Sequence, residues 1–380
     1  MSSKARVGSA GLIATLLSGC GAGLFETRPL GDSVRTADSI ATLLVTEQPS
    51  QRLGRMANRP VQLHVLLSPL DGKTPPRKIA IAGKLEELET RNTAKLLGSD
   101  GRYLWLLGNS ITAVELATGK LITAPELEKI NPALAGQWLK ESKYYEVKGR
   151  LRFTTADARK FELDQVSLQT RPYVEPPKPK LNYREDMERY NREMSMWGIG
   201  LEKFFWSGGF VTANDWFGLH TPDEADRNHH VGSRVTGESR NSRVDGRRLV
   251  YRAKIEACPL DFCLTAISPL PGEGYIGAAL LRDETQPRPL RLTEPDGFVM
   301  LHWSKLGKEG TLLVSRIGFD GKVAWNVDTG FVDIDQVFPG TPAIAFIGKG
   351  PAPANRVAEL GLVMIDTGTG QTNSRLFRQN

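Results

Sequence analysis

Short apolar runs separated by turn residues recur along the chain from residue 38 onward. Most runs alternate polar and apolar residues or are apolar over a few positions, and Gly, Pro, Asn or Asp stands between them. Runs of this kind are typical of β-strands. Strands are predicted at residues 40–45, 61–67, 78–82, 94–98, 103–107, 110–116, 248–255, 264–267, 275–281, 297–303, 312–317, 323–327 and 361–365. The pattern predicts an all-β fold.

One sequence repeat recurs along the chain: aliphatic strands joined by tight turns and followed by a Thr-Gly corner. It occupies residues 94–120, 312–330 and, in a shorter form, 361–370. Turn glycines stand at positions 72, 119, 330 and 370, and Ala158 could occupy an equivalent corner. Corners that follow one another directly are about 40 residues apart, the length of a four-stranded propeller blade. Because one such sheet cannot bury both faces alone, the spacing favours a radial array.

This sequence repeat resembles the blades of quinoprotein-like β-propellers, in which an aliphatic strand is followed by an Asp and then by a Thr-Gly corner. The resemblance implies a β-propeller with degenerate blades, for which seven is a candidate number. The docking Trp that such blades carry after the corner is replaced by Leu121, Val332 and Asn373. The adjacent Cys-Cys pair of quinone-dependent dehydrogenases is also missing from the sequence. The resemblance therefore implies the scaffold and no cofactor.

Residues 172–200 interrupt the strand pattern and divide the predicted blades into an N-terminal set, 37–171, and a C-terminal set, 201–380. Four prolines between residues 172 and 180 indicate a stiff linker. An apolar stripe follows in steps of four and three residues, which predicts a short amphipathic helix. The stripe consists of Tyr183, Met187, Tyr190, Met194 and Trp197. It either packs on the rim of the blades or docks a partner protein. Two smaller β domains in place of one ring are the alternative architecture.

The first residues have the pattern of a bacterial lipoprotein signal. Lys4 and Arg6 precede an apolar segment, residues 7–17, that is too short to span a bilayer. Its end, Leu-Ser-Gly-Cys, resembles the lipobox, which implies removal of residues 1–19 and acylation of Cys20. Residues 20–36 then form a lipidated tether. Gly21 follows the cysteine instead of Asp, which by the same resemblance points to the outer membrane, facing the periplasm. The alternative is an ordinary secretory signal that happens to contain a cysteine.

The charge and the cysteines of the chain limit the kinds of ligand and partner that the sequence predicts. The formal net charge is +6 with 24% charged residues spread along the chain, and a nucleic-acid-binding protein would need that charge clustered on one face. No nucleic-acid partner is therefore predicted. Cys258 and Cys263 are close in sequence and, in an oxidising compartment, favour a disulfide. A metal site is the alternative for this pair.

One polar segment carries candidate metal ligands. His220, His229 and His230 lie near Asp226 and other carboxylates, and imidazole with carboxylate is a zinc-type ligand set. The alternative is a solvated loop, since the sequence has no His-Glu-x-x-His motif and Pro222 disfavours a regular helix. No Gly-x-Ser-x-Gly elbow occurs either. The aromatic stretch 204–217 is compatible with a pocket or with a core.

These observations predict a lipid-anchored periplasmic β-propeller that acts as a non-enzymatic binding or scaffold module. Its partners would be the membrane, through the lipid anchor, and a protein or other component of the cell envelope. The alternative is a periplasmic enzyme that depends on a metal, held by the histidine segment, or on a quinone.

Overall fold

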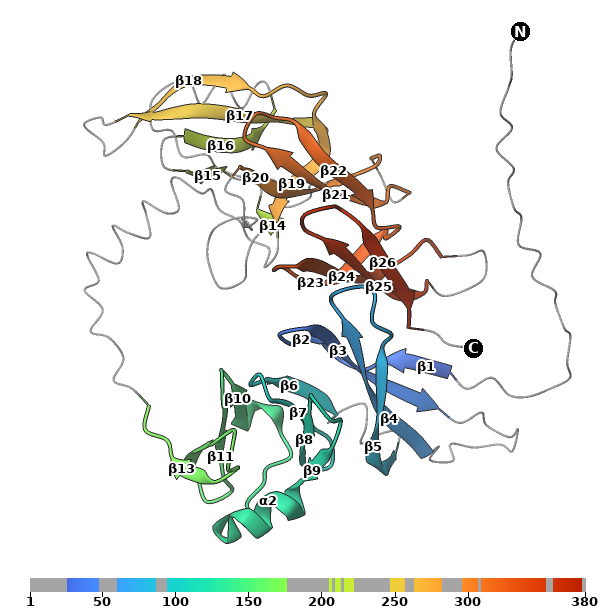
Figure 1. The fold of residues 1–380 in the computed structure, drawn as a ribbon, viewed down its shortest axis with the longest axis vertical. Helices are drawn as coiled ribbons and strands as arrows, with labels where there is room; N and C mark the ends of the chain where they lie inside the picture. The colour runs from blue at the N-terminus through green and yellow to red at the C-terminus, as the bar shows by residue number, and fades with distance from the viewer. Residues whose placement is uncertain are drawn as a thin grey trace, which may run out of the picture.

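The computed structural model places most of the described residues in short antiparallel strands (Figure 1). The described residues are 26–47, 60–86, 94–175, 205–206, 209–212, 215–221, 247–256, 263–281, 296–306, 309–352 and 358–377. They form five hydrogen-bonded sheets, one α-helix and two short 3-10 helices. The fold of the described residues is mostly β-sheet, which agrees with the predicted all-β class.

The first three sheets follow one another along the chain. The first sheet comprises β1 (Glu26–Pro29), β2 (Val34–Arg35), β3 (Ser39–Glu47), β4 (Pro60–Pro69) and β5 (Arg77–Glu86), with β1 and β2 both paired to β3. The second sheet comprises β6 (Lys95–Ser99), β7 (Tyr103–Leu107), β8 (Ile111–Glu115) and β9 (Leu121–Thr123). The third sheet comprises β10 (Tyr145–Val147), β11 (Leu151–Thr154), β12 (Lys160–Leu163) and β13 (Thr170–Pro172). Each sheet is antiparallel and built from a continuous stretch of chain, and the second and third are simple meanders.

The C-terminal half forms a large sheet and a last sheet. The large sheet comprises β14 (Phe205–Trp206), β15 (Gly209–Val211), β16 (Asp215–His220), β17 (Arg247–Glu256), β18 (Cys263–Pro269), β19 (Tyr275–Leu281), β20 (Gly297–Trp303), β21 (Leu312–Gly318) and β22 (Val323–Asp328). It contains two four-stranded meanders, β15 to β18 and β19 to β22, joined because the start of β17 pairs with β19. The last sheet comprises β23 (Asp333–Phe338), β24 (Ala343–Lys349), β25 (Leu360–Asp366) and β26 (Thr372–Leu376).

Buried apolar clusters connect the sheets face to face in a series. Leu151 and Phe153 of the third sheet pack with the second sheet, which packs in turn against the first. Ile40 of the first sheet shares a cluster with Ala345 of the last sheet. The last sheet packs against β19 to β22, and that meander packs against β16 and β17. The first and last sheets are therefore neighbours, as Figure 1 shows.

Polar contacts hold the first sheet to the last. The Arg35 guanidinium on β2 donates to the carbonyl oxygens of Phe338 and Ala343 at 3.1 and 2.9 Å and to that of Thr341 at 3.0 Å. Gln336 of β23 accepts from the Ser33 backbone N–H at 2.9 Å. Among the described strands, none pairs across from the first sheet to the last. Apolar packing and these hydrogen bonds therefore hold the two sheets together.

The α-helix of the described residues, α2 (Ala124–Ile130), follows β9 and was not predicted. The Glu126 carboxylate accepts from the backbone N–H of Thr123 at 2.7 Å and from its hydroxyl at 3.0 Å, and Pro125 lies in the first turn, where it needs no hydrogen-bond acceptor. The two 3-10 helices are Pro132–Leu134 and Ser142–Tyr144. No helix within the described ranges is long and apolar enough to cross a membrane.

Every strand predicted from the polar and apolar pattern is present, whereas the predicted boundaries of the tether and the linker differ. The tether expected over residues 20–36 is wrong from Glu26 onward, because β1 and β2 pair with β3 and Leu30 is buried. The linker expected from Pro172 begins one residue too early, since Pro172 ends the edge strand β13, where a residue without an N–H is tolerated. The remainder of the predicted linker and helix, from residue 176 to 200, lies outside the described residues.

The predicted corners share one backbone conformation. Ala158 has a φ of 64°, and Gly330 has a φ of 70°. The Ala158 N–H donates to the Thr155 carbonyl at 2.9 Å, which closes the turn between β11 and β12. The expectation that Ala158 occupies a corner usually filled by glycine is therefore confirmed.

We expect Ala158→Gly to stabilise the protein, because a left-handed conformation costs a non-glycine residue about 1–2 kcal/mol and the entropy of glycine offsets only part of that. The expected gain in the free energy of unfolding is about 0.5–1 kcal/mol, measured by urea denaturation. The matched reverse change is Gly330→Ala, where an added Cβ has nothing within 4 Å and only the backbone is strained. It should lose a similar amount. A loss of stability in Ala158→Gly would contradict this account of the corner.

Candidate functional site

Most residues predicted to form a site lie outside the described part of the chain. These residues are Cys20, Cys258, Asp226, His229, His230, Tyr183, Met187, Tyr190, Met194 and Trp197. Cys263 is the first residue of β18, but its side chain is not described, so the disulfide with Cys258 stays a prediction. His220 is the predicted metal ligand whose surroundings the structure describes.

His220 lies in a buried aromatic row on β16. Its ring stacks on Trp216 at a centroid distance of 5.3 Å, and the side chain is buried. Gly218 lies between them, and a Cβ there would come within 2.1 Å of the Trp216 ring. Within the described residues, no group of three metal-binding side chains comes together. Of the aromatic side chains in residues 204–217, the structure describes those of Trp216 and Phe217, and both are core.

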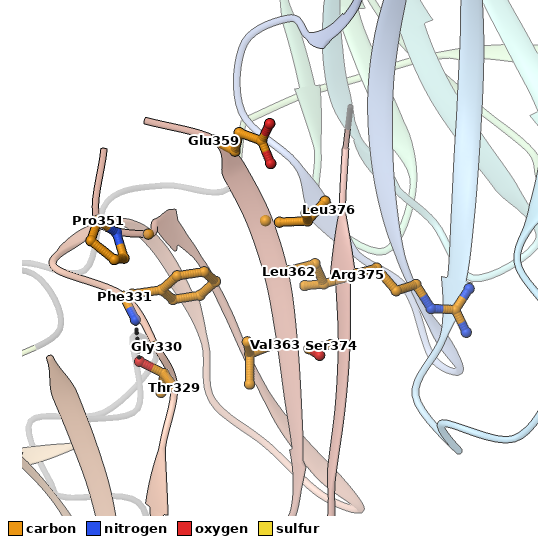
Figure 2. A pocket seen from close by; sticks show the side chains of 12 residues that line it. Thr329, Gly330, Phe331, Pro351, Glu359, Leu362, Val363, Ser374, Arg375 and Leu376 are labelled. Carbon is orange, nitrogen blue, oxygen red and sulfur yellow. Dashed lines mark hydrogen bonds between the residues drawn. The ribbon is translucent and has the colours of Figure 1, made fainter. Parts of the chain in front are cut away.

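A second candidate is a pocket of about 300 Å³ beside the last sheet (Figure 2). Its lining residues are Thr329, Gly330, Phe331, Gly350, Pro351, Glu359, Gly361, Leu362, Val363, Ser374, Arg375 and Leu376. Figure 2 shows the Phe331 ring among the lining residues and the Arg375 side chain directed away from it, toward the first sheet. That side chain donates to the Thr74 carbonyl at 3.4 Å. The pocket walls are largely apolar, which suits an apolar side chain or small molecule.

The hydroxyl group of Thr329, beside Phe331 in the pocket, is already hydrogen-bonded. Thr329 Oγ1 donates to the Leu312 carbonyl at 2.9 Å and accepts from the Phe331 N–H at 3.1 Å, the bond drawn in Figure 2. Its hydroxyl is therefore committed to holding the turn before β23. Among the lining residues, no serine or threonine stands next to a histidine base. The geometry of this pocket suits binding.

A third candidate is a buried polar row on the large sheet. His302 Nε2 lies 2.8 Å from Ser315 Oγ, and Ser315 Oγ donates to Asn326 Oδ1 at 3.0 Å. A nucleophilic serine needs an imidazole within hydrogen-bond distance and also access to a substrate. Ser315 is only 1% exposed, so this access is missing and the row is structural.

A fourth candidate lies on the third sheet and was missed by the sequence analysis. The Glu162 carboxylate, 8% exposed, accepts hydrogen bonds from Arg150 at 3.0 Å, from Arg152 at 3.1 Å and from Arg171 at 2.5 Å. The Arg171 contact, followed by those of Arg152 and Arg150, lowers the pKa of Glu162 to about 2 against the opposing effect of burial. The carboxylate is therefore ionised throughout the neutral range. We call these four residues the arginine cluster.

The aromatic ring of Tyr173 supports the arginine cluster from one side. The Arg152 guanidinium lies 4.5 Å from the Tyr173 ring centroid, within the range of a cation–π contact. The alternation Arg150-Leu151-Arg152 was a visible sign of a strand with a basic face. The pairing with Glu162 and Arg171 depends on strand register, which the sequence pattern did not provide.

Comparisons with known proteins do not assign this chain to a family. No protein-family model matches the sequence, and no curated protein is similar to it. Uncomplexed Pyrococcus horikoshii acylaminoacyl peptidase is 11% identical over 89% of this chain and 45% of its own, with a TM-score of 0.24. The orthorhombic crystal form of the same peptidase is 10% identical over 92% of this chain and 46% of its own, with a TM-score of 0.24. A chain from the Saccharomyces cerevisiae structure of Dbp5 bound to Nup159, Gle1, IP6 and ADP is 9% identical over 92% of this chain and 95% of its own, with a TM-score of 0.20.

The chain spans less than half the length of the peptidase chains that it matches. TM-scores this low carry no conclusion about fold or activity. The candidate sites are therefore judged from their own geometry.

We expect His302 to make stability depend on pH between its unfolded and folded pKa values. Burial lowers the pKa of His302 from 6.5 to about 4. As pH falls below 6.5 the unfolded chain binds a proton that the folded protein excludes, so stability decreases until about pH 4. The full loss is about 3 kcal/mol.

Thermal unfolding of the protein and of His302→Gln, measured from pH 7 to pH 4, tests this expectation. The glutamine keeps a hydrogen bond to Ser315 without the titration, so its midpoint should change less across that window. Burial also lowers the pKa of His64, which remains in the variant and leaves a residual slope. Equal slopes in the two proteins would show that His302 is not the group responsible.

Proposed function

We propose that this chain is a lipid-anchored periplasmic binding module built as a propeller-like ring. The observation that carries the proposal is the series of six antiparallel units, the five-stranded first sheet and five four-stranded meanders, in which the first and last sheets along the chain are packed together. Such a return of the chain to its starting point is what a radial array requires. The third sheet and the β15–β18 meander are the two ends of the described series.

The anchoring part of the proposal rests on the sequence of the first twenty residues. The segment from Leu17 to Cys20 resembles a lipobox, and acylation at Cys20 would hold the chain to a membrane. The first strand begins at Glu26, and the few residues between it and Cys20 span at most about 20 Å. The module would therefore be held close to the outer membrane, on its periplasmic side.

The binding part of the proposal is supported by the kind of groups that the described surface offers. The pocket beside Phe331 has largely apolar walls, and the arginine cluster presents charged groups on a sheet face. Both suit recognition of a protein or another envelope component. The Ser315–His302 pair is buried and does not face the surface.

We expect Cys20→Ser to lose acylation and to move from the membrane fraction to the soluble periplasmic fraction. Growth with an alkyne-labelled fatty acid, followed by fractionation and capture of the label, measures both properties. Cys263→Ser is the matched control, because it also replaces one cysteine by serine and should keep the label and the membrane location. Label on Cys20→Ser, or an unlabelled wild-type protein, would contradict lipid anchoring.

The same purified protein tests the enzymatic alternative. A metal-dependent enzyme should contain close to one metal ion per chain, lost when His229 and His230 are both replaced by alanine. A quinone-dependent enzyme should carry a chromophore. A stoichiometric envelope partner, recovered with wild-type protein from detergent-solubilised membranes together with neither group, would support the binding module.

A further inference from the structure

The third sheet has one apolar face and one charged face. Leu151, Phe153 and Phe161 belong to the buried cluster shared with the second sheet. Because side chains alternate along a strand, the residues between them lie on the opposite face. The register places Arg152 opposite Glu162 and Glu162 opposite Arg171, so the three form a row across β11, β12 and β13. The charged face is that of the arginine cluster.

The cluster has an excess of positive charge. Three guanidinium groups surround one carboxylate, which neutralises only one of them. Arg150 and Arg171 are 39% and 61% exposed, whereas Glu162 is 8% exposed. The negative charge is therefore at the base of the cluster and the positive charges are at its surface. A ligand approaching this face would meet the arginines first.

The arginine side chains are held in place before any ligand arrives. Glu162 engages one N–H of Arg150, one of Arg152 and two of Arg171. Each guanidinium has five N–H donors, so donors that Glu162 does not use remain on all three. Fixed guanidinium groups lose little side-chain entropy on binding and match the two oxygens of a carboxylate.

We propose that the exposed side of the arginine cluster binds an acidic segment of a partner protein, through carboxylates that contact Arg150 and Arg171. This inference rests on the binding function proposed above and names the chemistry of the partner. The cluster already binds one carboxylate, that of Glu162, with charge-assisted hydrogen bonds from all three arginines. A second carboxylate above the same guanidinium groups would neutralise part of the excess charge.

Nearby acidic side chains favour a protein segment over an anionic lipid surface. Glu146 lies 4.0 Å from Arg152 and 2.5 Å from Lys148, and Glu175 lies 3.0 Å from Lys160. Because each of these carboxylates is paired with a lysine, acidic and basic groups alternate around the cluster instead of forming a uniformly basic surface that would suit a lipid bilayer. A peptide can place its carboxylates at the arginines and neutral residues beside Glu146 and Glu175.

The test measures binding of a fluorescent peptide with alternating Asp and Ser to the detergent-solubilised, full-length protein. We expect Arg150→Gln/Arg171→Gln to weaken binding at least tenfold, because both exposed guanidinium groups are removed while the Arg152–Glu162 pair remains. The matched control is Arg102→Gln/Arg159→Gln. It removes the same charge from two ion-paired arginines that are 44% and 53% exposed, and it should bind like the wild type.

Several outcomes would overturn the inference: no binding of the Asp peptide, equal binding of a peptide with Asn in place of Asp, or equal losses in both double variants. Binding to phosphatidylglycerol vesicles, lost in Arg150→Gln/Arg171→Gln while the Asp peptide does not bind, would assign the cluster to lipid instead. Thermal midpoints of both variants confirm that they fold. If the peptide fails but the protein still recovers a stoichiometric envelope partner, this site alone is wrong and the binding function stands.

Discussion

The contact between the first and last sheets is the constraint on which the rest of the arrangement depends. Each of the two sheets pairs its strands within its own stretch of chain, and among the described strands no ladder crosses from one to the other. The Arg35 guanidinium replaces such a ladder by donating to three carbonyl oxygens around the β23–β24 turn. Gly340 is required in that turn, since a Cβ there would come within 2.9 Å of the guanidinium. Burial lowers the pKa of Arg35, but an arginine stays charged at neutral pH, so these remain charge-assisted hydrogen bonds.

With the first and last sheets together, each sheet within the series has neighbours on both faces, and the faces at the ends of the series differ in character. The β16–β17 end carries the aromatic row of Trp216 and His220, whereas the third sheet ends the series with the arginine cluster. A charged face of this kind does not form an apolar contact between sheets, because burying the three arginines would cost more than one carboxylate recovers. The same physical reason that stops the apolar packing at the third sheet makes its face available for a charged partner.

The sequence pattern predicted the strands well because alternation and turn residues are local. The corner at Ala158 was predicted from spacing alone and has the expected positive φ. Helix α2 was missed because it is only seven residues long and its capping by Glu126 depends on a single side chain. The strands β1 and β2 have no local strand pattern because they are short, and their pairing is supplied by β3. The arginine cluster could not be predicted, since it joins residues from three strands through their register.

Hydrogen exchange of the full-length protein and of Arg35→Met tests the central contact most directly. If Arg35 holds the two sheets together, its loss should speed amide exchange in β3 of the first sheet and in β24 of the last sheet, while β11 of the third sheet is unchanged. Lys322→Met, which removes an exposed cation on β21–β22, should leave all three strands as in the wild type. Faster exchange confined to the residues beside Arg35, with β24 unaffected, would contradict the account.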